Sequence, residues 1–389
     1  MALRVRTLTP EEHVAFLATR DSASFLQTPA WGEVKREWRA ESIGWVEEPS
    51  GTPPSRTAGS DPGGDEKILG AALVLYRRLP KMRRSLAYLP EGPIIDWADP
   101  DLARWLVPLA EHVTAQGAFG IRMGPPVICR RWSAATIKAA LAEGKAKSIA
   151  EVPPDHVDHT ALGVAQQLRK LGWRPPAENA TGFTAGQPRY VFQVPLAGRT
   201  EDDLLKGMNQ LWRRNIKRAA KSGVVVSQGT PDDLPAFHEL YVETARRDHF
   251  NPRPLTYFTT MFRALNAEEP DRIRLYLAHH EGDLVAATTW VRVGSHVWYS
   301  NGASSTRKRE VRGSNAIQWQ MMRDALREGA TVYDLRGITD TLDENDSHFG
   351  LLQFKIGTGG EVAEYLGEWD LPISRLLYTA FDLYMRRRG

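Results

Sequence analysis

The sequence predicts an α+β protein, and two observations lead to this class. The first is a run of two apolar strands, a helix and a third strand between residues 68 and 123. The second is that a similar order returns between residues 273 and 335, so that the second half of the chain repeats the first. Grouped strands with helices between them are typical of mixed sheets covered by helices. We therefore expect two domains in tandem, over 1–197 completed by 366–389, and over 198–365.

Composition and charge limit the class of protein. The 389 residues are 42% hydrophobic and 25% charged, which is ordinary for a soluble chain with ample core. The net charge is only +3, so any binding of nucleic acid must depend on a local patch. Cys129 is the single cysteine, which excludes intramolecular disulfides and multi-cysteine metal sites, and we expect no metal. No long apolar core starts the chain and no apolar run approaches about 20 residues, so a cytoplasmic protein is expected.

A short helix and a loop are expected ahead of the first core. A threonine–proline pair opens the helix, whose apolar face carries Trp31, Val34 and Trp38. Lys35 lies off this face, where a solvated cation is the ordinary explanation. Residues 47–66 are rich in Pro, Gly and Ser and have no periodicity, which predicts a loop.

The most basic segment is predicted to be one long helix between Thr200 and Gly223. Thr200 is a helix cap, and apolar residues including Leu211 and Trp212 form one stripe. Five cations share the helix without acids four residues away to neutralise them: Arg213, Arg214, Lys217, Arg218 and Lys221. A patch of this kind can follow a phosphate backbone, and a solvated face is the alternative.

Two further segments carry residues suited to a phosphorylated ligand. Arg253 and Tyr257 are four apart at a helix start, so both can lie on one face, although Arg253 could instead pair with Asp248. Tyr299 lies on a strand that leads through a basic loop into another helix. That loop, Arg309–Asn315, matches only half of the pattern that cradles the pyrophosphate of coenzyme A in acetyltransferases.

Residues 350–370 hold one lysine, Lys355, inside an apolar run. Gly357, Gly359 and Gly360 follow it, and glycines so close together permit a sharp turn or a close approach to a ligand. A lysine held beside such a turn is suited to a phosphate or a developing oxyanion. On these residues alone, a β-hairpin with its lysine reaching water is the simpler explanation.

Several motifs in order resemble the Fem (FemABX) family. Phe354-Lys355 precedes Gly-x-Gly-Gly-Glu and a closing Tyr-x-Gly-x-Trp-Asp-Leu-Pro, and Tyr299 opens a Tyr-x-x-Gly-Ala-Ser motif. The resemblance runs from about residue 24 to residue 373 and implies two acetyltransferase-like (GNAT) domains without a coiled-coil arm. It also implies an aminoacyltransferase that takes glycine, alanine or serine from aminoacyl-tRNA. The acceptor would be the stem-peptide amine of a peptidoglycan precursor, either lipid II or UDP-MurNAc-pentapeptide.

The resemblance also implies roles for individual residues. Lys355 would be catalytic, and the residues expected to hold the acceptor are Lys35, Arg253, Tyr257, Tyr299 and Phe354. The five cations of the basic helix would bind tRNA, and no cofactor beyond this co-substrate is implied. Gly124 departs from the family pattern, in which an acidic residue usually precedes the proline.

Other functions remain open from the residues themselves. They are a coenzyme A-dependent N-acyltransferase, a tRNA-dependent amide-forming enzyme of peptide natural-product synthesis, and an RNA-binding module without catalysis. The chain ends in a helical stripe that includes Leu376, Ala380 and Phe381, followed by Arg386–Arg388. We expect most of this stripe to pack on the first domain and the arginines to make a peripheral membrane contact. A monomer is expected.

Overall fold

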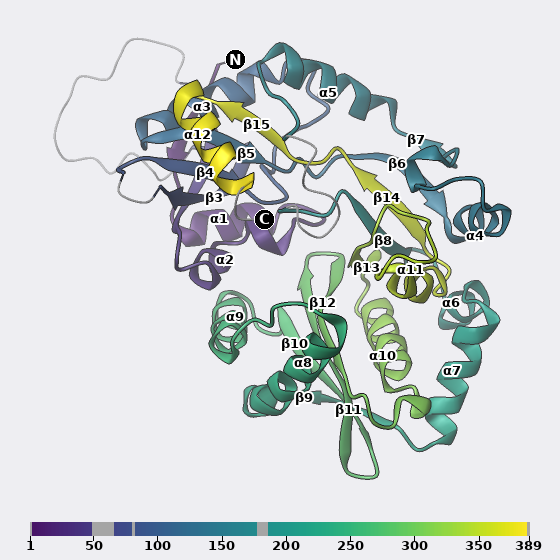
Figure 1. The fold of residues 1–389 in the computed structure, drawn as a ribbon. Coiled ribbons are helices and arrows are strands. Elements are labelled where there is room, and N and C mark those ends of the chain that lie inside the picture. Colours follow the sequence, from purple (N-terminus) through teal and green to yellow (C-terminus); the bar gives the residue numbers. More distant parts are fainter. Residues whose placement is uncertain (1, 49–65, 80–81, 177–185, 387–389) are drawn as a thin grey trace.

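The computed structural model describes residues 2–48, 66–79, 82–176 and 186–386, and the loop expected over 47–66 lies almost entirely outside them. The fold has two mixed sheets, one of six strands in the order β1-β2-β3-β4-β5-β15 and one of nine in the order β7-β6-β14-β8-β13-β12-β11-β10-β9. Figure 1 shows them as two lobes, with the segment from β14 to β15 passing from one lobe to the other. The expected α+β class is confirmed, and no coiled-coil arm occurs among the described residues.

The six-stranded sheet is built from the N-terminal strands and one late strand. Its strands are β1 (Leu3–Thr7), β2 (Arg39–Glu47), β3 (Gly70–Arg78), β4 (Ser85–Leu89), β5 (Ala118–Met123) and β15 (Trp369–Pro372). Among the described strands of this sheet, only β4 and β5 pair in parallel. The helices of this lobe are α1 (Pro10–Leu17), α2 (Pro29–Val34), α3 (Ala103–Ala115), α5 (His159–Lys170) and α12 (Arg375–Arg386).

The nine-stranded sheet carries most of the later elements. Its strands are β6 (Ile128–Ser133), β7 (His156–Val157), β8 (Tyr190–Pro195), β9 (Val225–Gly229), β10 (Ile273–His280), β11 (Asp283–Val293), β12 (His296–Ser304), β13 (Val332–Gly337) and β14 (Glu361–Tyr365). The helices are α4 (Ala134–Glu143), α6 (Glu201–Gly207), α7 (Gln210–Lys221), α8 (Leu234–Asp248), α9 (Leu255–Glu268), α10 (Gly313–Arg327) and α11 (Phe349–Ile356). Short 3-10 turns occupy Phe25–Gln27, Ile149–Glu151, Pro231–Asp233 and Arg309–Val311.

The change from one sheet to the other does not coincide with residue 197. Strands β6, β7 and β8 precede that residue but belong to the nine-stranded sheet, because β14 inserts between β6 and β8 and pairs with both. Strand β15, by contrast, pairs with β5 and closes the six-stranded sheet, where Arg122 also binds Asp370 at 2.7 Å. Pairing across more than 160 residues of chain leaves no local signal in the sequence.

One apolar core is shared by the two lobes and fixes their relative position. It joins Leu73 and Leu75 of β3 to Leu275 of β10 and Val291 of β11, all nearly without solvent exposure. Helices α2 and α9 pack on each other at its edge, and the backbone N–H of Ala30 donates to a carboxylate oxygen of Glu268 at 2.6 Å. A buried apolar contact of this extent holds the cleft between the lobes in one geometry.

The expectation of one helix between Thr200 and Gly223 is wrong, since α6 and α7 are separate. The Asn209 side chain accepts from the backbone N–H of Trp212 at 2.8 Å and caps the second helix. The chain bends there because the backbone N–H of Asn209 donates to the carbonyl of Gly357 at 2.9 Å. Leu211, which the pattern assigned to the apolar stripe, is 50% exposed.

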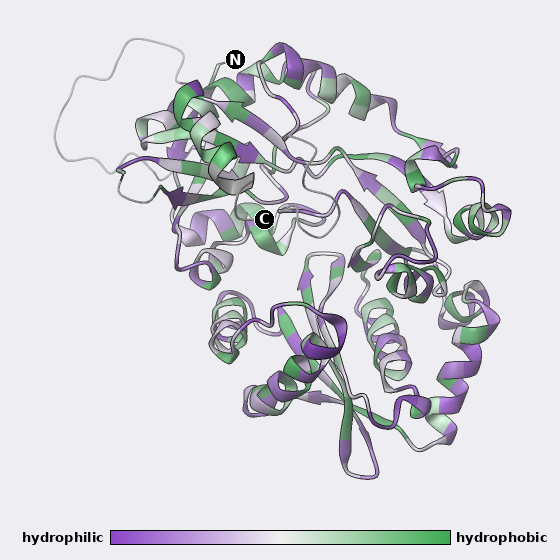
Figure 2. Cartoon of the chain, viewed as in Figure 1, coloured by the Kyte–Doolittle hydropathy of each residue, from purple (hydrophilic) through white to green (hydrophobic). Residues whose placement is uncertain are grey.

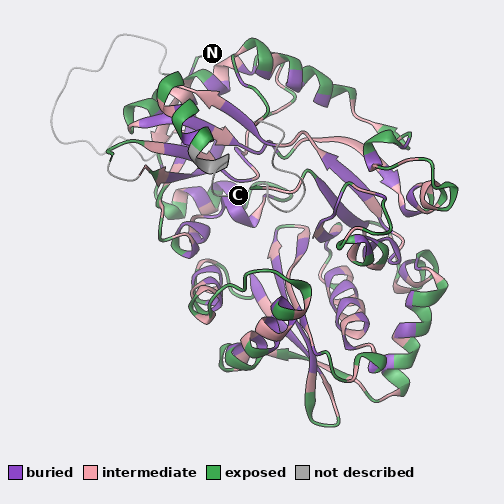
Figure 3. Cartoon of the chain, in the orientation of Figure 1, coloured by how far each residue is buried: buried purple, intermediate pink, exposed green. Residues whose placement is uncertain are grey.

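Two C-terminal expectations also need correction. Lys355 lies on helix α11 and not in a β-hairpin, so its side chain points into the protein and does not reach water. On α12, Tyr378 and Phe381 are buried and pack on Phe119. Leu376 faces outward and is 82% exposed, so the helix is rotated relative to the expected stripe. Figures 2 and 3 show α12 with apolar residues on its exposed side.

Candidate active site

Three of the expected acceptor-binding residues come together at the junction of the lobes. Lys35 ends α2, and its Nζ lies 5.7 Å from the ring centre of Tyr257 at the start of α9. The guanidinium carbon of Arg253 lies 5.4 Å from the same ring. Because α2 and α9 are packed on each other, two helices distant in sequence present these groups side by side. Neither cation forms an ion pair in the described part of the chain, so this acceptor cluster can receive an anion.

The electrostatics of the acceptor cluster favour a negatively charged ligand. Burial lowers the pKa of Lys35, and the neighbouring charge of Arg253 lowers it further. A bound phosphate would relieve both effects, because it returns a counter-charge to the lysine. Burial raises the pKa of Tyr257 to about 12, so its hydroxyl stays protonated and can donate a hydrogen bond. Arg253 does not pair with Asp248, which binds Arg247 instead.

Tyr299 lies close to α8 and not among the residues of the acceptor cluster. Burial raises its pKa to about 12, and the charges of Asp248 and Tyr241 at α8 add to the effect. Its hydroxyl also lies over Gly302, where a Cβ would meet the oxygen at 2.1 Å, so glycine is needed for the tyrosine to fold back along β12. The tyrosine is therefore held as a neutral hydrogen-bonding group next to the end of α8.

Lys355 is buried, and its ammonium group faces main-chain carbonyls. The side chain is 3% exposed, and its Nζ donates to the carbonyl of Gly337 at 2.6 Å and to that of Arg336 at 3.4 Å. Burial lowers its pKa to about 7, although the carboxylate of Asp334 opposes this shift. Arg336 has a φ of 64°, a conformation that costs a non-glycine residue of order 1–3 kcal/mol. The two carbonyl contacts therefore hold the strained turn at Arg336.

Phe354 connects α11 to the basic helix α7. Its ring centre lies 4.7 Å from that of Trp212, and the indole N–H of Trp212 donates to the Phe354 carbonyl at 2.8 Å. Phe354 also lines a pocket of about 240 Å³ between α7 and the start of α10, with Asn215 and Arg312. The expected substrate-binding Phe354 thus lies on the side of α7 and not in the acceptor cluster.

All five cations of the basic patch are exposed on α7, whose outer face Figure 2 shows as strongly hydrophilic. None of them pairs with a carboxylate within the described ranges; Arg213 donates only to the carbonyl of Lys206, at 3.2 Å. Arg309 and Arg312 add positive charge around the pocket at the start of α10, whereas Lys308 in the same lining is paired with Glu281 and Asp283. A single polyanion can therefore contact both the helix and this pocket.

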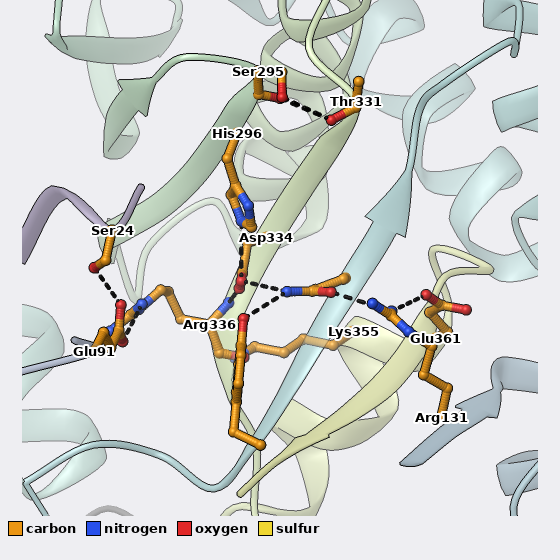
Figure 4. Close-up of polar contacts among 12 residues, drawn as sticks. Ser24, Glu91, Arg131, Ser295, His296, Thr331, Asp334, Arg336, Lys355 and Glu361 are labelled. Atoms are coloured by element: carbon orange, nitrogen blue, oxygen red, sulfur yellow. Dashed lines mark hydrogen bonds and ion pairs between the residues drawn. The ribbon is translucent and has the colours of Figure 1, made fainter. Parts of the chain in front are cut away.

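A polar network that the motifs did not reveal runs through the middle of the molecule (Figure 4). Asp334 on β13 is almost fully buried; it lies 3.3 Å from His296 Nε2 and accepts from Gln193 at 3.0 Å. Burial opposes its ionisation, but the hydrogen bonds from His296 and Gln193 and the charge of Arg336 prevail and lower its pKa. Gln193 also donates to the hydroxyl of Tyr365 at 3.3 Å. The network therefore carries a fixed carboxylate at its centre.

Arg336 connects this network to the other lobe. Its guanidinium pairs with Glu91 at 2.8 Å, and Glu91 also accepts from the Ser24 hydroxyl at 2.5 Å. The Arg336 backbone N–H donates to Asp334 at 2.6 Å, and its carbonyl accepts from Lys355. Lys355 is thus linked to His296 through two residues of β13: Lys355 contacts Arg336, Arg336 contacts Asp334, and Asp334 contacts His296 (Figure 4). The network joins residues from seven separate segments, and only Lys355 and Tyr365 among them belonged to a recognised motif.

The network opens into a pocket of about 310 Å³ between the lobes, the interlobe pocket. Its polar lining includes Ser24, Glu91, Gln193, His296 and Tyr365, and the indole of Trp298 forms part of its apolar lining. Gly124 also lines it, with its Cα next to the backbone of Glu91. Gly124 brings no side chain to this pocket, and the carboxylate of Glu91 is part of the same lining.

No group of three or more His, Cys, Asp or Glu side chains that could hold a metal ion is found among the described residues. Over the same residues, no helix combines the length and the apolar character needed to cross a bilayer.

The chain is similar to proteins that are already known. It matches the FemAB family over residues 8–281 and 274–386. The chain belongs to the FemAB family. A lipid II:glycine glycyltransferase of Staphylococcus aureus (strain MRSA252) is 23% identical over an alignment of 448 residues. The alignment covers 96% of this chain and 94% of that protein. The corresponding protein of strain USA300 is 22% identical with the same coverage.

Solved structures agree with this assignment at the level of the fold. The crystal structure of FemX covers 97% of this chain and 100% of its own, with a TM-score of 0.76 at 22% identity. The structure of L-PGS from Bacillus licheniformis covers 98% of this chain and 97% of its own, with a TM-score of 0.52 at 11% identity. The family resemblance drawn from the motifs is confirmed.

Proposed function

We propose that this protein transfers an amino acid from aminoacyl-tRNA to the stem-peptide amine of a peptidoglycan precursor. The observation that carries the proposal is the acceptor cluster, in which Lys35, Arg253 and Tyr257 meet from both lobes without a described carboxylate partner. Two cations and a protonated phenol are suited to the pyrophosphate that links the sugar of such precursors to its carrier. Family membership supports the same class of reaction.

The donor would be bound by a separate surface around α7. The cations of α7 and the pocket beside Phe354 form one positive surface suited to a tRNA acceptor end. The ester of an aminoacyl-tRNA is already activated, so that transfer needs positioning and oxyanion stabilisation and neither ATP nor a metal. Glycine, alanine and serine are the candidate amino acids, and the names of the relatives make glycine with lipid II the first pair to test.

A peripheral membrane contact is part of the proposal, since a lipid-linked acceptor is presented at a bilayer surface. Leu376 and Leu383 are 82% and 51% exposed on one side of α12, and Met82 is 40% exposed in the same lobe. Exposed leucines one or two helical turns apart favour an interfacial helix. The arginines at 387–388 lie outside the described residues.

The proposal is tested with purified protein and three radiolabelled aminoacyl-tRNAs, carrying glycine, alanine or serine. Each is incubated with lipid II and, separately, with UDP-MurNAc-pentapeptide, and the product is identified by its mass. Free amino acid with uncharged tRNA is the matched control, and radiolabelled acetyl-CoA tests the acyltransferase alternative. Failure of every charged tRNA with both acceptors would refute the proposal, and acetyl transfer would replace it.

A further inference from the structure

The proposed reaction needs a group that moves a proton, and none of the motif residues supplies it. The nitrogen of the acceptor amine carries an extra proton once it has bonded to the ester carbonyl. Lys355 is occupied by the carbonyls of Arg336 and Gly337 and is not part of the lining of the interlobe pocket. This inference rests on the proposed function and concerns the residue that takes this proton.

Four titratable side chains line the interlobe pocket within the described part of the chain, and three of them are engaged. Glu91 is bound by Arg336 and Ser24, and Arg131 is paired with Glu361. Burial raises the pKa of Tyr365 above its ordinary value, so its phenol stays protonated. The fourth is His296, and imidazole is the side chain that most readily exchanges protons near neutral pH.

His296 has the geometry of an oriented base. Its Nε2 lies 3.3 Å from the carboxylate of Asp334, so in the neutral ring the N–H belongs on that nitrogen and the lone pair on Nδ1. Nδ1 forms no hydrogen bond with any residue that the structure describes. The ring stacks on Trp298 with centres 4.1 Å apart and planes 13° from parallel, which fixes its plane at the pocket wall.

Asp334 is itself held in place from three directions. It accepts from Gln193 at 3.0 Å and from the backbone N–H of Arg336 at 2.6 Å, in addition to His296. The carboxylate is 1% exposed and therefore cannot turn toward solvent. A buried carboxylate that orients an imidazole and stabilises its protonated form is the arrangement by which histidine acts as base and then as acid.

We infer that His296 is the proton-transfer residue of the reaction and that Asp334 is its positioning residue. The acceptor nitrogen attacks the ester carbonyl of aminoacyl-tRNA and forms the C–N bond. His296 Nδ1 takes one proton from that nitrogen. The bond from the carbonyl carbon to the ribose oxygen then breaks, and His296 returns the proton to this oxygen. The products are an amide and a tRNA with a free terminal hydroxyl, and the imidazole is neutral again.

The test compares His296 with a matched histidine elsewhere. In the full chain, His296→Ala should lower kcat by about 10²-fold or more while the KM values of both substrates hardly change. Added imidazole should restore part of the rate in this variant. His296→Gln, which keeps an N–H toward Asp334, should be equally slow without rescue. The control is His112→Ala, because His112 also pairs with a buried carboxylate, Glu41 at 2.9 Å, but lies in the other lobe.

The outcomes separate this inference from the proposed function. Asp334→Asn should also lower kcat, and combining it with His296→Ala should add little further loss because the two act as a unit. Wild-type kcat in His296→Gln would overturn the inference. A loss in His296→Ala that imidazole does not restore, accompanied by raised KM values, would also overturn it, because that result indicates a structural role. An unmutated chain that transfers from no aminoacyl-tRNA would overturn the proposed function, and this inference with it.

Discussion

The burial of Lys355 makes the stability of the fold depend on pH in a defined direction. Burial lowers the pKa of this lysine from an ordinary 10.5 to about 7. Between these two values the unfolded chain holds the proton and the folded chain does not, so the free energy of unfolding rises with pH. Below pH 7 both states carry the charge and the folded state bears the full cost of burying it. The complete window corresponds to roughly 5 kcal/mol, or about 1.4 kcal/mol per pH unit.

The perturbation is Lys355→Met, which keeps the length of the side chain and removes the titrating group. Urea unfolding of both proteins is measured at three pH values between about 7 and 9. Wild type should gain about 1 kcal/mol or more per pH unit relative to the variant, because all other groups titrate alike in both. Lys221→Met, which removes an exposed lysine of α7, is the control. Parallel pH dependence for wild type and Lys355→Met would refute the reasoning and leave the lysine as a permanent cation.

Three further outcomes are expected. Arg253→Ala should raise the KM for the precursor more than it lowers kcat, because the guanidinium belongs to the acceptor cluster and does not touch the reacting atoms. Steady-state transfer measures both constants. An unchanged KM would show that Arg253 does not bind the acceptor. Arg213→Glu combined with Lys217→Glu should weaken tRNA binding and reduce the dependence of its affinity on salt, while the affinity for the precursor stays the same. Filter binding measures the tRNA affinity. An unaltered salt dependence would show that the cations of α7 are only a solvated face. Leu376→Ser combined with Leu383→Ser should reduce co-sedimentation with anionic vesicles without changing transfer to a soluble precursor. Equal sedimentation of this variant and the wild type would exclude α12 from the membrane contact.

The interlobe network gives Lys355 a second function besides the expected one. Its Nζ binds the carbonyl of the strained residue Arg336, and Arg336 holds Glu91 across the cleft. Loss of the lysine therefore disturbs the turn that places both Glu91 and the neighbouring Asp334. Lys355→Met is expected to reduce transfer by about 10²-fold, the loss that a small misplacement of the site can cause. Because a positioning role through Arg336 would also reduce transfer, the pH dependence of stability is the more specific measurement.

Some of the site was accessible from local pattern and motif order. Arg253 and Tyr257 are four residues apart at a helix start, and this spacing alone puts them on one face of α9. Lys35 follows the short helix that the threonine–proline pair predicted. Their proximity across the two lobes could be predicted only through the family resemblance, because nothing in the spacing of the sequence relates residue 35 to residue 253.

The sequence by itself determined the α+β class, the family, the exposed cations of α7 and the helix that bears Tyr257, because these follow from periodicity, capping residues and motif order. Only the tertiary structure decided that β6 and β8 belong with β14, that residues 200–223 form two helices, and that Lys355 is buried on a helix. It also decided that His296 meets Asp334 and that Glu91 meets Arg336. Strand pairing and burial join residues far apart in the chain, and the free energy of such contacts depends on the partner, which no local pattern specifies.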